Sequence, residues 1–333
     1  MRLLSLAPAL TALLTLGGCM TMTTTPEPLT PPETQYDARI VEVSGGRSLS
    51  IRELADQLAT SDVVVIGEYH GHHGAHLLQS RLQNALYLHR QDQVLTMEQF
   101  NLDRQAELDR YLDGKTGETE MVEDAGAWDN YRASYRPLVE FARTHDTPVI
   151  AANAPAQIVR CVGRQGAGYL EKLDASVRSQ LPSEPFMDTP RYRERFVEAI
   201  AGSHGTGDAT MSERMNNTYL AQLLRDNTMA SRILDARGTY PGYQVLHLTG
   251  TFHSESGLGT VALLKQRAPD LSVAVITPVF WGAGDSGAPL EDNREKGDYL
   301  YFIQPLPTEF RDQERAREAM KARFSRPQGE SCD

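Results

Sequence analysis

Short apolar runs that alternate with helical patterns constrain the fold of this chain more than any other feature of its sequence. The runs are rich in β-branched and aromatic residues, and apolar residues at helical spacing separate the early ones. Such alternation predicts βαβ units and an α/β fold with a mainly parallel sheet flanked by helices. The predicted strands are Val63–Ile66, Val94–Met97, Pro148–Ala151, Gln244–Leu248, Ser272–Ile276 and Tyr299–Gln304.

A long stretch between the third and fourth of these strands carries no strand pattern. Between Asn153 and Gly242 apolar residues recur at helical spacing, with a glycine-rich break at Gly202–Gly207. We therefore expect residues 155–240 to form a helical insertion subdomain that lies over the carboxyl ends of the strands.

The first 18 residues have the pattern of a bacterial lipoprotein signal peptide. Arg2 supplies a short positive region, and after an apolar run Leu16-Gly17-Gly18-Cys19 places small residues directly before a cysteine. The run is shorter than the ~20 residues of a membrane-spanning helix. We expect Cys19 to be lipidated and to become the mature N-terminus, with an uncleaved anchor or an ordinary signal peptide as alternatives. An aspartate directly after the lipidated cysteine would favour retention in the inner membrane, but position 20 is Met20. We therefore expect an outer-membrane lipoprotein of the cell envelope that faces the periplasm.

Composition divides the mature chain into a tether, a body and a tail. Residues 19–37 form a predicted lipid-anchored tether, because Thr21 to Gln35 contains six threonines and four prolines. Residues 38–310 form the predicted domain, and residues 311–333 a polar C-terminal tail. The net charge is −11, and about −12 without Arg2, which argues against nucleic acid as a partner and against electrostatic attachment to a membrane. We expect membrane contact through the lipid anchor alone.

Two cysteines remain after Cys19, namely Cys161 and Cys332. An oxidising periplasm would allow a disulfide that ties the tail to the body, and two free or buried thiols are the alternative. The sequence leaves the pairing open.

Polar side chains follow four of the predicted strands at the point where each strand ends. Glu68 and His70 follow the first strand, Glu98 the second, Asn153 the third and His253 the fourth. Because the carboxyl ends of parallel strands share one edge of a sheet, we expect these side chains to converge. The alternative is that they are ordinary polar caps that close loops.

The segment after the first strand is rich in histidine. Four of the nine histidines lie within residues 70–76, next to Glu68. Imidazole and carboxylate groups are common ligands of zinc and iron and common acid–base groups. The predicted metal ligands are therefore Glu68, His70, Glu98 and His253, and the two glutamates are the catalytic candidates if the protein is an enzyme.

Neighbouring residues are weaker candidates. His72 and His73 flank glycines, and we expect both to face solvent. His76 starts a predicted helix and is a candidate to point into the site. Tyr69 is expected to pack away from Glu68 unless its phenol binds ferric iron.

The predicted insertion adds one helical face. Gln222, Asp226 and Met229 recur at i, i+4 and i+7, so they form either a partly solvated stripe or a face that closes the site from above. Of the other histidines, His247 is expected in the core, and the remaining three on the surface or in a polar loop. These three are His89, His145 and His204.

Paired Gly-x-x-His motifs and two glutamates stand in an order that extends from about Leu54 to Thr277. The full set is Gly67-Glu68-Tyr69-His70 with His76, Met97-Glu98, Tyr135-Arg136-Pro137-Leu138-Val139-Glu140-Phe141-Ala142, Ala151-Ala152-Asn153-Ala154-Pro155, Ala221-Gln222 with Asp226-Asn227-Thr228-Met229-Ala230, and Gly250-Thr251-Phe252-His253. This set resembles the ChaN-type haem-binding lipoproteins of the Tiki/TraB-related superfamily. The lipobox, Leu16-Gly17-Gly18-Cys19, fits this resemblance as well.

The resemblance implies a parallel α/β core with a helical subdomain, and haem binding for iron acquisition. It assigns the four predicted metal ligands to the site, with His76 and Asn153 beside them. It leaves the axial iron ligand open among Tyr69, Tyr131 and Tyr135. Covalent haem attachment is not expected, because the sequence has no Cys-x-x-Cys-His. The haem-binding candidates are Glu68, Tyr69, His70, His76, Glu98, Asn153, Gln222, Asp226, Met229 and His253.

Two functions fit the same residues. The first is a lipid-anchored haem-binding protein of the cell envelope, with an outer-membrane haem receptor and a second copy of the chain as candidate partners. The alternative is a metal-dependent or His/Glu-based hydrolase, an esterase or peptidase, with a divalent transition metal as its cofactor. A wide apolar slot would favour haem, whereas an open metal position near bound water would favour hydrolysis.

Overall fold

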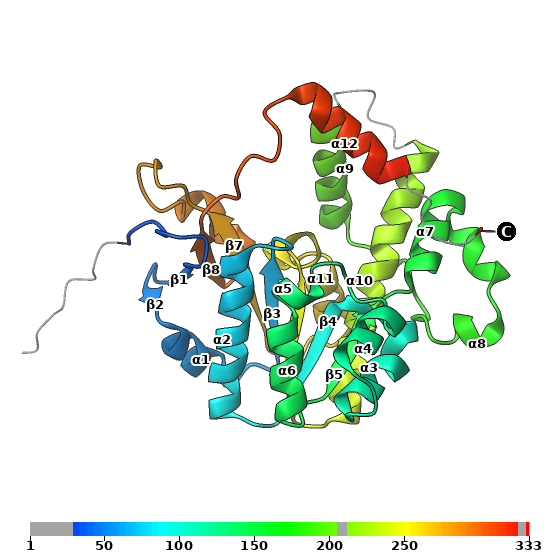
Figure 1. The fold of residues 1–333 in the computed structure, drawn as a ribbon, viewed down its shortest axis with the longest axis horizontal. Helices are drawn as coiled ribbons and strands as arrows, with labels where there is room; N and C mark the ends of the chain where they lie inside the picture. The colour runs from blue at the N-terminus through cyan, green and yellow to red at the C-terminus, as the bar shows by residue number, and fades with distance from the viewer. Residues whose placement is uncertain (1–28, 205–211, 326–330, 333) are drawn as a thin grey trace, which may run out of the picture.

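The computed structural model describes residues 29–204, 212–325 and 331–332, and its framework is one eight-stranded sheet (Figure 1). The strand order is β2-β1-β8-β7-β3-β6-β4-β5. Neighbouring strands from β8 to β5 run parallel, whereas β1 pairs antiparallel with both β8 and β2. The predicted α/β fold with a mainly parallel sheet is therefore confirmed. The strands are β1 Arg39–Glu42, β2 Ser48–Leu49, β3 Val63–Glu68, β4 Gln93–Asn101, β5 Val149–Asn153, β6 Gln244–Gly250, β7 Val273–Phe280 and β8 Tyr299–Ile303.

Helices cover both faces of the sheet, and alternate residues of β3 show the division. Val64 and Ile66 join a core with residues of α1, α2 and α6, whereas Val63 and Val65 join a core with α10 and α11. Because both faces are covered, β3 is apolar along its length up to Gly67 instead of alternating with polar residues. These helices are α1 Ile51–Leu58, α2 His73–His89, α6 Arg136–Thr144, α10 Glu213–Thr239 and α11 Thr260–Arg267.

Short helices link these layers. They are η1 Leu102–Arg104, α3 Gln105–Leu112, α4 Glu118–Asp124, α5 Tyr131–Ser134, η3 Thr251–His253, η4 Glu255–Gly257 and η5 Glu291–Lys296.

The described part of the predicted insertion is helical and contains no strand. α10 begins there, packs on α7 through residues such as Leu224, and ends against the sheet, where Ile233 joins the second core. The predicted bounds of the insertion, 155–240, stay a prediction. The helices before α10 are α7 Ala156–Gln165, η2 Ala167–Lys172, α8 Ala175–Arg178 and α9 Pro190–His204.

Both described ends of the chain contact the body. Gln304 Nε2, just after β8, donates to the Pro32 carbonyl at 2.9 Å. Figure 1 shows α12, Gln313–Ser325, crossing above α9. Beyond α12, Cys332 forms a disulfide with Cys161 of α7, with Cα atoms 5.5 Å apart. The structure thus pairs the two cysteines whose state the sequence left open.

The predicted signal peptide, the lipidation site and most of the tether lie outside the described residues. Within the ranges that the structure describes, no helix is both long and apolar enough to cross a membrane.

Candidate functional site

Three adjacent strands bring the predicted polar groups to one edge of the sheet. Because β6 lies between β3 and β4, the residues that end or follow these strands meet at the carboxyl edge. His70 Nδ1 lies 2.7 Å from Glu68 Oε1, and His253 Nε2 lies 3.5 Å from Glu98 Oε1. The structure therefore brings together the four residues that the sequence singled out, as two imidazole–carboxylate pairs.

Glu68 is a buried carboxylate held by several donors. Tyr135 Oη donates to Oε1 at 2.6 Å, and Gln79 Nε2 donates to Oε2 at 2.7 Å. Burial raises the pKa of Glu68, but the hydrogen bond from His70 and the charge of His76 lower it by more, so the pKa lies below its usual value. Glu68 is thus held as an anion that orients the groups around it.

His70 uses one ring nitrogen on Glu68, which leaves the other facing away from that carboxylate. A carboxylate can only accept, so Nδ1 carries a hydrogen, and Nε2 has a lone pair when the ring is neutral. A Cβ atom on Gly250 would lie only 2.9 Å from Nε2, so the missing side chain at Gly250 makes room for the ring. The His70 side chain is 44% exposed, and Trp128 meets it edge-on with centroids 4.9 Å apart. Burial lowers the pKa of His70, but Glu68 raises it more, so the pKa lies above its usual value.

His253 is oriented from the opposite side by α10. Its Nδ1 donates to Asp226 Oδ1 at 2.8 Å, and Asp226 also accepts from Tyr192 Oη at 2.6 Å and from Thr260 Oγ1 at 2.9 Å. Burial lowers the pKa of His253, whereas the charges of Asp226 and Glu98 raise it, with a net rise above the usual value.

Glu98 completes the second pair. The Thr249 hydroxyl and the Gly250 amide each donate to its Oε2 at 2.7 Å. Burial raises the pKa of Glu98, but the charges of His253 and His70 and these hydrogen bonds lower it overall, to about 2. The site therefore holds two anions and two imidazoles that favour the protonated state.

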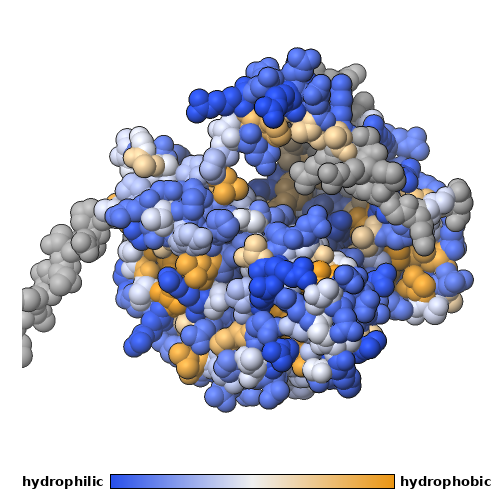
Figure 2. Space-filling view, viewed as in Figure 1, coloured by the Kyte–Doolittle hydropathy of each residue, from blue (hydrophilic) through white to orange (hydrophobic). Residues whose placement is uncertain are grey.

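A cavity of about 460 Å³ opens above the two pairs. Two aromatic side chains form part of its walls, and each is backed by other aromatic rings: Tyr69 stacks on Phe280 with centroids 4.3 Å apart, and Phe252 packs against Tyr192 and Phe196. Figure 2 shows the surface hollowed beneath α12. A polar floor between aromatic walls suits a planar, largely apolar ligand with a few polar groups. The lining residues are Glu68, Tyr69, His70, Gln222, Gly250, Thr251, Phe252 and His253.

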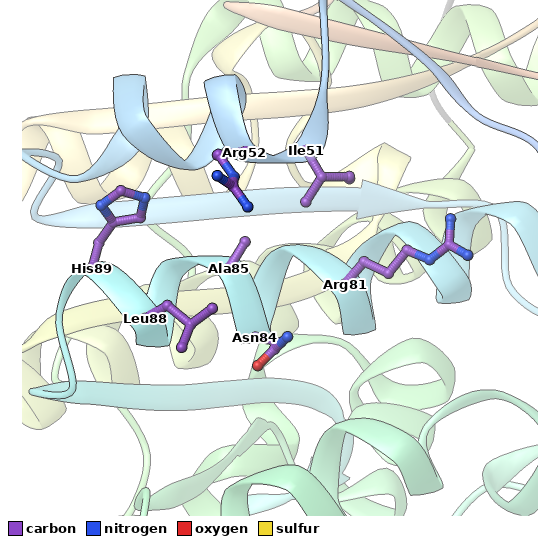
Figure 3. A pocket seen from close by; sticks show the side chains of 7 residues that line it. All are labelled: Ile51, Arg52, Arg81, Asn84, Ala85, Leu88 and His89. Carbon is purple, nitrogen blue, oxygen red and sulfur yellow. The ribbon is translucent and has the colours of Figure 1, made fainter.

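A second cavity, of about 470 Å³, lies between α1 and the C-terminal half of α2 (Figure 3). Its basic side chains, Arg52, Arg81 and His89, are all exposed, and His89 Nε2 lies 2.9 Å from Asp56 Oδ1. Exposed basic side chains beside Leu88 do not form the buried, mutually oriented set found at the strand ends. We therefore place the candidate site at the carboxyl edge of the sheet.

Comparison with known families matches residues 54–264, well over half of the chain, to the family described as haem-binding uptake, Tiki superfamily, ChaN. The chain belongs to the ChaN family.

Similar proteins extend this comparison. Among solved structures, the chain is similar to the one titled "Cofacial heme binding to ChaN of Campylobacter jejuni", with a TM-score of 0.62 and 16% identity over 84% of this chain and 100% of that one. At this identity the likeness shows a shared fold. Among curated proteins, it is 24% identical over 196 residues to Protein RETICULATA-RELATED 5, chloroplastic, of Arabidopsis thaliana. That match covers 55% of this chain and only 25% of the plant protein, so the chain spans about a quarter of its length.

The three tyrosines among which the sequence left the expected iron ligand open differ in access. Tyr69 is half-buried and lines the cavity. Tyr131 and Tyr135 are fully buried, and burial raises the pKa of both phenols far above the usual value. Tyr135 is engaged as a donor to Glu68, so Tyr69 is the tyrosine that a ligand in the cavity can reach.

The expectation that His72 faces solvent is wrong. His72 is fully buried, because its Nδ1 accepts from the Gly74 amide at 3.1 Å as the cap of α2 and its Nε2 donates to the Gln304 carbonyl at 2.8 Å. His73 is exposed, as expected. His76 is buried in the first turn of α2, and its Nδ1 lies 3.6 Å from Glu68 Oε2.

The remaining candidates lie at different depths. Gln222 lines the cavity with its Nε2 3.2 Å from His253 Nδ1, and Asp226 lies beneath His253. Met229 is deeper, with its Sδ 3.7 Å from Thr249 Oγ1. Asn153 is buried at the end of β5 and does not line the cavity.

The other histidines follow the sequence expectations where the structure describes them. His247 is buried, with its Nδ1 2.9 Å from Thr96 Oγ1, and burial lowers its pKa to about 4. His89 and His145 are exposed. The side chain of His204 lies outside the described part of the chain.

Sequence reasoning missed several residues of the site. Gln79 and Gln99 both donate to Glu68, and Gln79 could have been found because it lies three residues after His76 on the same helical face. The contact of Phe280 with Tyr69 joins β7 to the loop after β3 and leaves no signal in either segment. Within the described residues, no group of three or more His, Cys, Asp or Glu side chains is arranged to hold a metal ion.

Proposed function

We propose that this ChaN-family protein binds haem non-covalently in the cavity at the carboxyl edge of the sheet, as part of haem or iron uptake. The observation that carries the proposal is an accessible imidazole, that of His70, at the floor of a cavity with aromatic walls. Haem iron needs an axial donor atom, and the faces of a porphyrin need apolar contacts. The description of the family as haem-binding uptake supports the same conclusion.

His70 is the axial ligand that we propose. The anionic Glu68 fixes the ring with its hydrogen on Nδ1 and increases the basicity of Nε2, as carboxylates behind ligand histidines do. Tyr69 is the alternative, because its phenol lines the same cavity. Burial and the charge of Glu255 raise the pKa of Tyr69, which disfavours the phenolate that binds ferric iron.

Titration of the purified protein with haemin, followed by the Soret band, tests this proposal. We expect saturable binding by the natural sequence. We expect His70→Ala to weaken it by about tenfold or more and to change the Soret position, since an axial ligand is lost. His73→Ala is the matched control, because this exposed histidine lies in the same segment and should leave binding unchanged.

Two outcomes would change the conclusion. An unaltered spectrum for His70→Ala, together with loss of binding in Tyr69→Phe, would assign the iron to Tyr69. If haemin produced no saturable Soret change with the natural sequence, the haem proposal would fail.

We further propose that the protein is anchored in the outer membrane through a lipidated Cys19 and faces the periplasm. The lipobox and the acidic charge of the mature chain support this, and the disulfide suits an oxidising compartment. We expect Cys19→Ser to leave the protein unprocessed or to release it from the membrane fraction, whereas Cys332→Ser should be processed and retained. Normal processing and retention of Cys19→Ser would contradict the proposal.

A second candidate function, hydrolysis of an ester or amide, is favoured by one observation. His253 is held between Asp226 and Glu98, an arrangement that suits a general base because the aspartate fixes the ring and stabilises its protonated form. Hydrolysis of p-nitrophenyl acetate by the natural sequence, lost in His253→Gln, would support this function. Equal rates for both proteins would exclude hydrolysis by His253.

The two partners expected from the sequence, a second copy of the chain and an outer-membrane haem receptor, remain predictions.

A further inference from the structure

Two basic side chains flank one buried carboxylate beside the cavity. Arg195 Nη2 of α9 donates to Glu255 Oε2 of η4 at 2.8 Å, and Lys296 Nζ of η5 lies 3.1 Å from Glu255 Oε1. The Glu255 side chain is only 8% exposed, so each of its oxygens faces one of the two cations and little solvent. We call these three residues the Glu255 cluster. Two cations stand against one anion, which leaves the cluster with an excess of positive charge.

Both aromatic side chains in the cavity walls lie close to the Glu255 cluster. The Arg195 guanidinium lies over the ring of Phe252, with Cζ 5.7 Å from the ring centroid. Tyr69 lines the cavity as Phe252 does. Burial raises the pKa of Tyr69 most, the charge of Glu255 raises it further, and the charge of Arg195 lowers it. The cluster therefore stands at the edge of the cavity, beside the residues that line it and away from its floor.

The two cations keep donors that Glu255 does not use. Arg195 Nε is buried and has no partner among the described residues. A buried N–H group without an acceptor costs free energy unless water or a ligand satisfies it. The Lys296 carbonyl accepts from Thr277 Oγ1 at 2.8 Å, which fixes the backbone of Lys296 beside β7. Its ammonium group carries three donors, more than one carboxylate oxygen takes up.

The imidazoles at the floor of the cavity are already matched with carboxylates. His70 Nδ1 lies 2.7 Å from Glu68 Oε1, and His253 lies between Asp226 and Glu98. A ligand carboxylate at the floor would meet these buried anions at short range, and like charges repel most strongly where water is excluded. A negatively charged part of a ligand is therefore better placed at the edge of the cavity, where cations are in excess.

We propose that Arg195 and Lys296 form a subsite at the edge of the cavity that recognises a carboxylate of the ligand, which for haem is a propionate. This inference rests on the proposed function. A guanidinium offers a carboxylate several N–H donors in one plane, and an ammonium group adds a second charge. Glu255 competes with the ligand for the same donors, so it limits how tightly an acidic ligand is held.

The experiment compares haemin with haemin dimethyl ester, in which both propionates are neutral. Soret titrations give the dissociation constant of each porphyrin, and their ratio measures the preference for the acid. We expect the natural sequence to prefer haemin by about tenfold. This is the lower part of the range for hydrogen bonds to charged groups, because the Arg195 and Lys296 side chains are 28% and 31% exposed. Arg195→Gln and Lys296→Gln should each lower the preference by about threefold or more.

Glu255→Gln should change the preference in the opposite direction. It removes the competing anion and leaves both cations to the ligand, so we expect the preference for haemin to rise by about threefold or more. A substitution that only disturbed the wall at Phe252 would weaken both porphyrins together and leave their ratio unchanged. The opposite signs therefore separate recognition of a carboxylate from a structural role.

Arg193→Gln is the matched control on the same helix. Like Arg195, Arg193 pairs with a carboxylate, that of Asp188 at 2.8 Å, and lies over an aromatic ring, that of Tyr219 at 4.9 Å. Neither Asp188 nor Tyr219 lines the cavity, so Arg193→Gln should keep the full preference. Lys296→Gln supplies the deciding ratio if Arg195→Gln does not fold.

The outcomes separate the two proposals. An undiminished preference for haemin in Arg195→Gln, an equal loss in Arg193→Gln, or a loss in Glu255→Gln would overturn the subsite and leave haem binding intact. Failure of the natural sequence to bind either porphyrin would overturn the proposed function and the subsite with it.

Discussion

Glu98 links protonation of a single buried side chain to the stability of the fold. Its pKa is about 2 in the folded protein against 4.5 for an ordinary glutamate. A lowered pKa contributes stability that is present above pH 4.5 and is lost as the pH falls toward 2, about 3 kcal/mol in all. We expect the free energy of unfolding of Glu98→Gln, measured in urea between pH 6 and pH 3, to lose that part of the acid dependence.

An exposed glutamate provides the control for this prediction. Glu318→Gln on α12 should follow the natural sequence across the same pH range. If Glu98→Gln lost stability with acid as steeply as the natural sequence, the charge of Glu98 would not be what the fold depends on.

The two site histidines couple to pH in the opposite sense. His70 and His253 have pKa values raised above 6.5, so their contribution to stability is present below pH 6.5 and is lost as the pH rises through the raised values. Together with Glu98, they favour a protein that is most stable at mildly acidic pH.

The sequence could predict which residues belong to the candidate site more readily than it could predict the contacts that those residues make. Glu68, His70 and His253 could be chosen because each follows an apolar run, and a parallel sheet must bring such positions together. Tyr69 and Tyr135 could not be ranked as ligands. What separates them is that Tyr135 donates to Glu68 inside the fold, a contact across 67 positions that no local pattern encodes.

At the scale of elements, the sequence predicted the six strands of the parallel part of the sheet and missed the two short antiparallel strands. β3 to β8 match the six apolar runs, since strands of a parallel sheet covered on both faces need nearly continuous apolar residues. β1 contributes only Ile40 and Val41 to the interior, and β2 has two residues. Strands this short gain their stability from pairing, β2 with β1 and β1 with β8, and β8 lies more than 250 residues further along the chain than β1.

The start of α2 offers a test of His72 as a structural residue. His72→Ala removes the acceptor for the Gly74 and Ala75 amides and the hydrogen bond to Gln304. We expect a loss of about 1–3 kcal/mol in the free energy of unfolding in urea. Haemin affinity should be nearly unchanged, because the His72 side chain does not line the cavity.

His73→Ala serves as the control here too, with an expected change of less than about 0.5 kcal/mol for an exposed side chain. A haemin affinity that fell in His72→Ala as far as in His70→Ala would assign His72 to the ligand site.

At the scale of the whole molecule, the C-terminal segment is tied back to the insertion. The chain leaves the sheet after β8, forms α12 above α9, and returns to α7 through Cys332. The sequence could name both cysteines but not their pairing, because 171 positions separate them and their distance depends on how the insertion folds.

Loss of this disulfide should destabilise the protein through the unfolded chain. A cross-link over 171 positions removes much of the conformational freedom of the unfolded state, and native disulfides contribute about 2–5 kcal/mol. We expect Cys332→Ser to lower the free energy of unfolding in urea within this range. The natural sequence should fall to the same value in a reductant, whereas Cys332→Ser should not respond to it. If the reductant destabilised both proteins equally, its effect would not come from this disulfide. If Cys332→Ser were as stable as the oxidised natural sequence, the disulfide between the tail and α7 would add nothing to the stability of the fold.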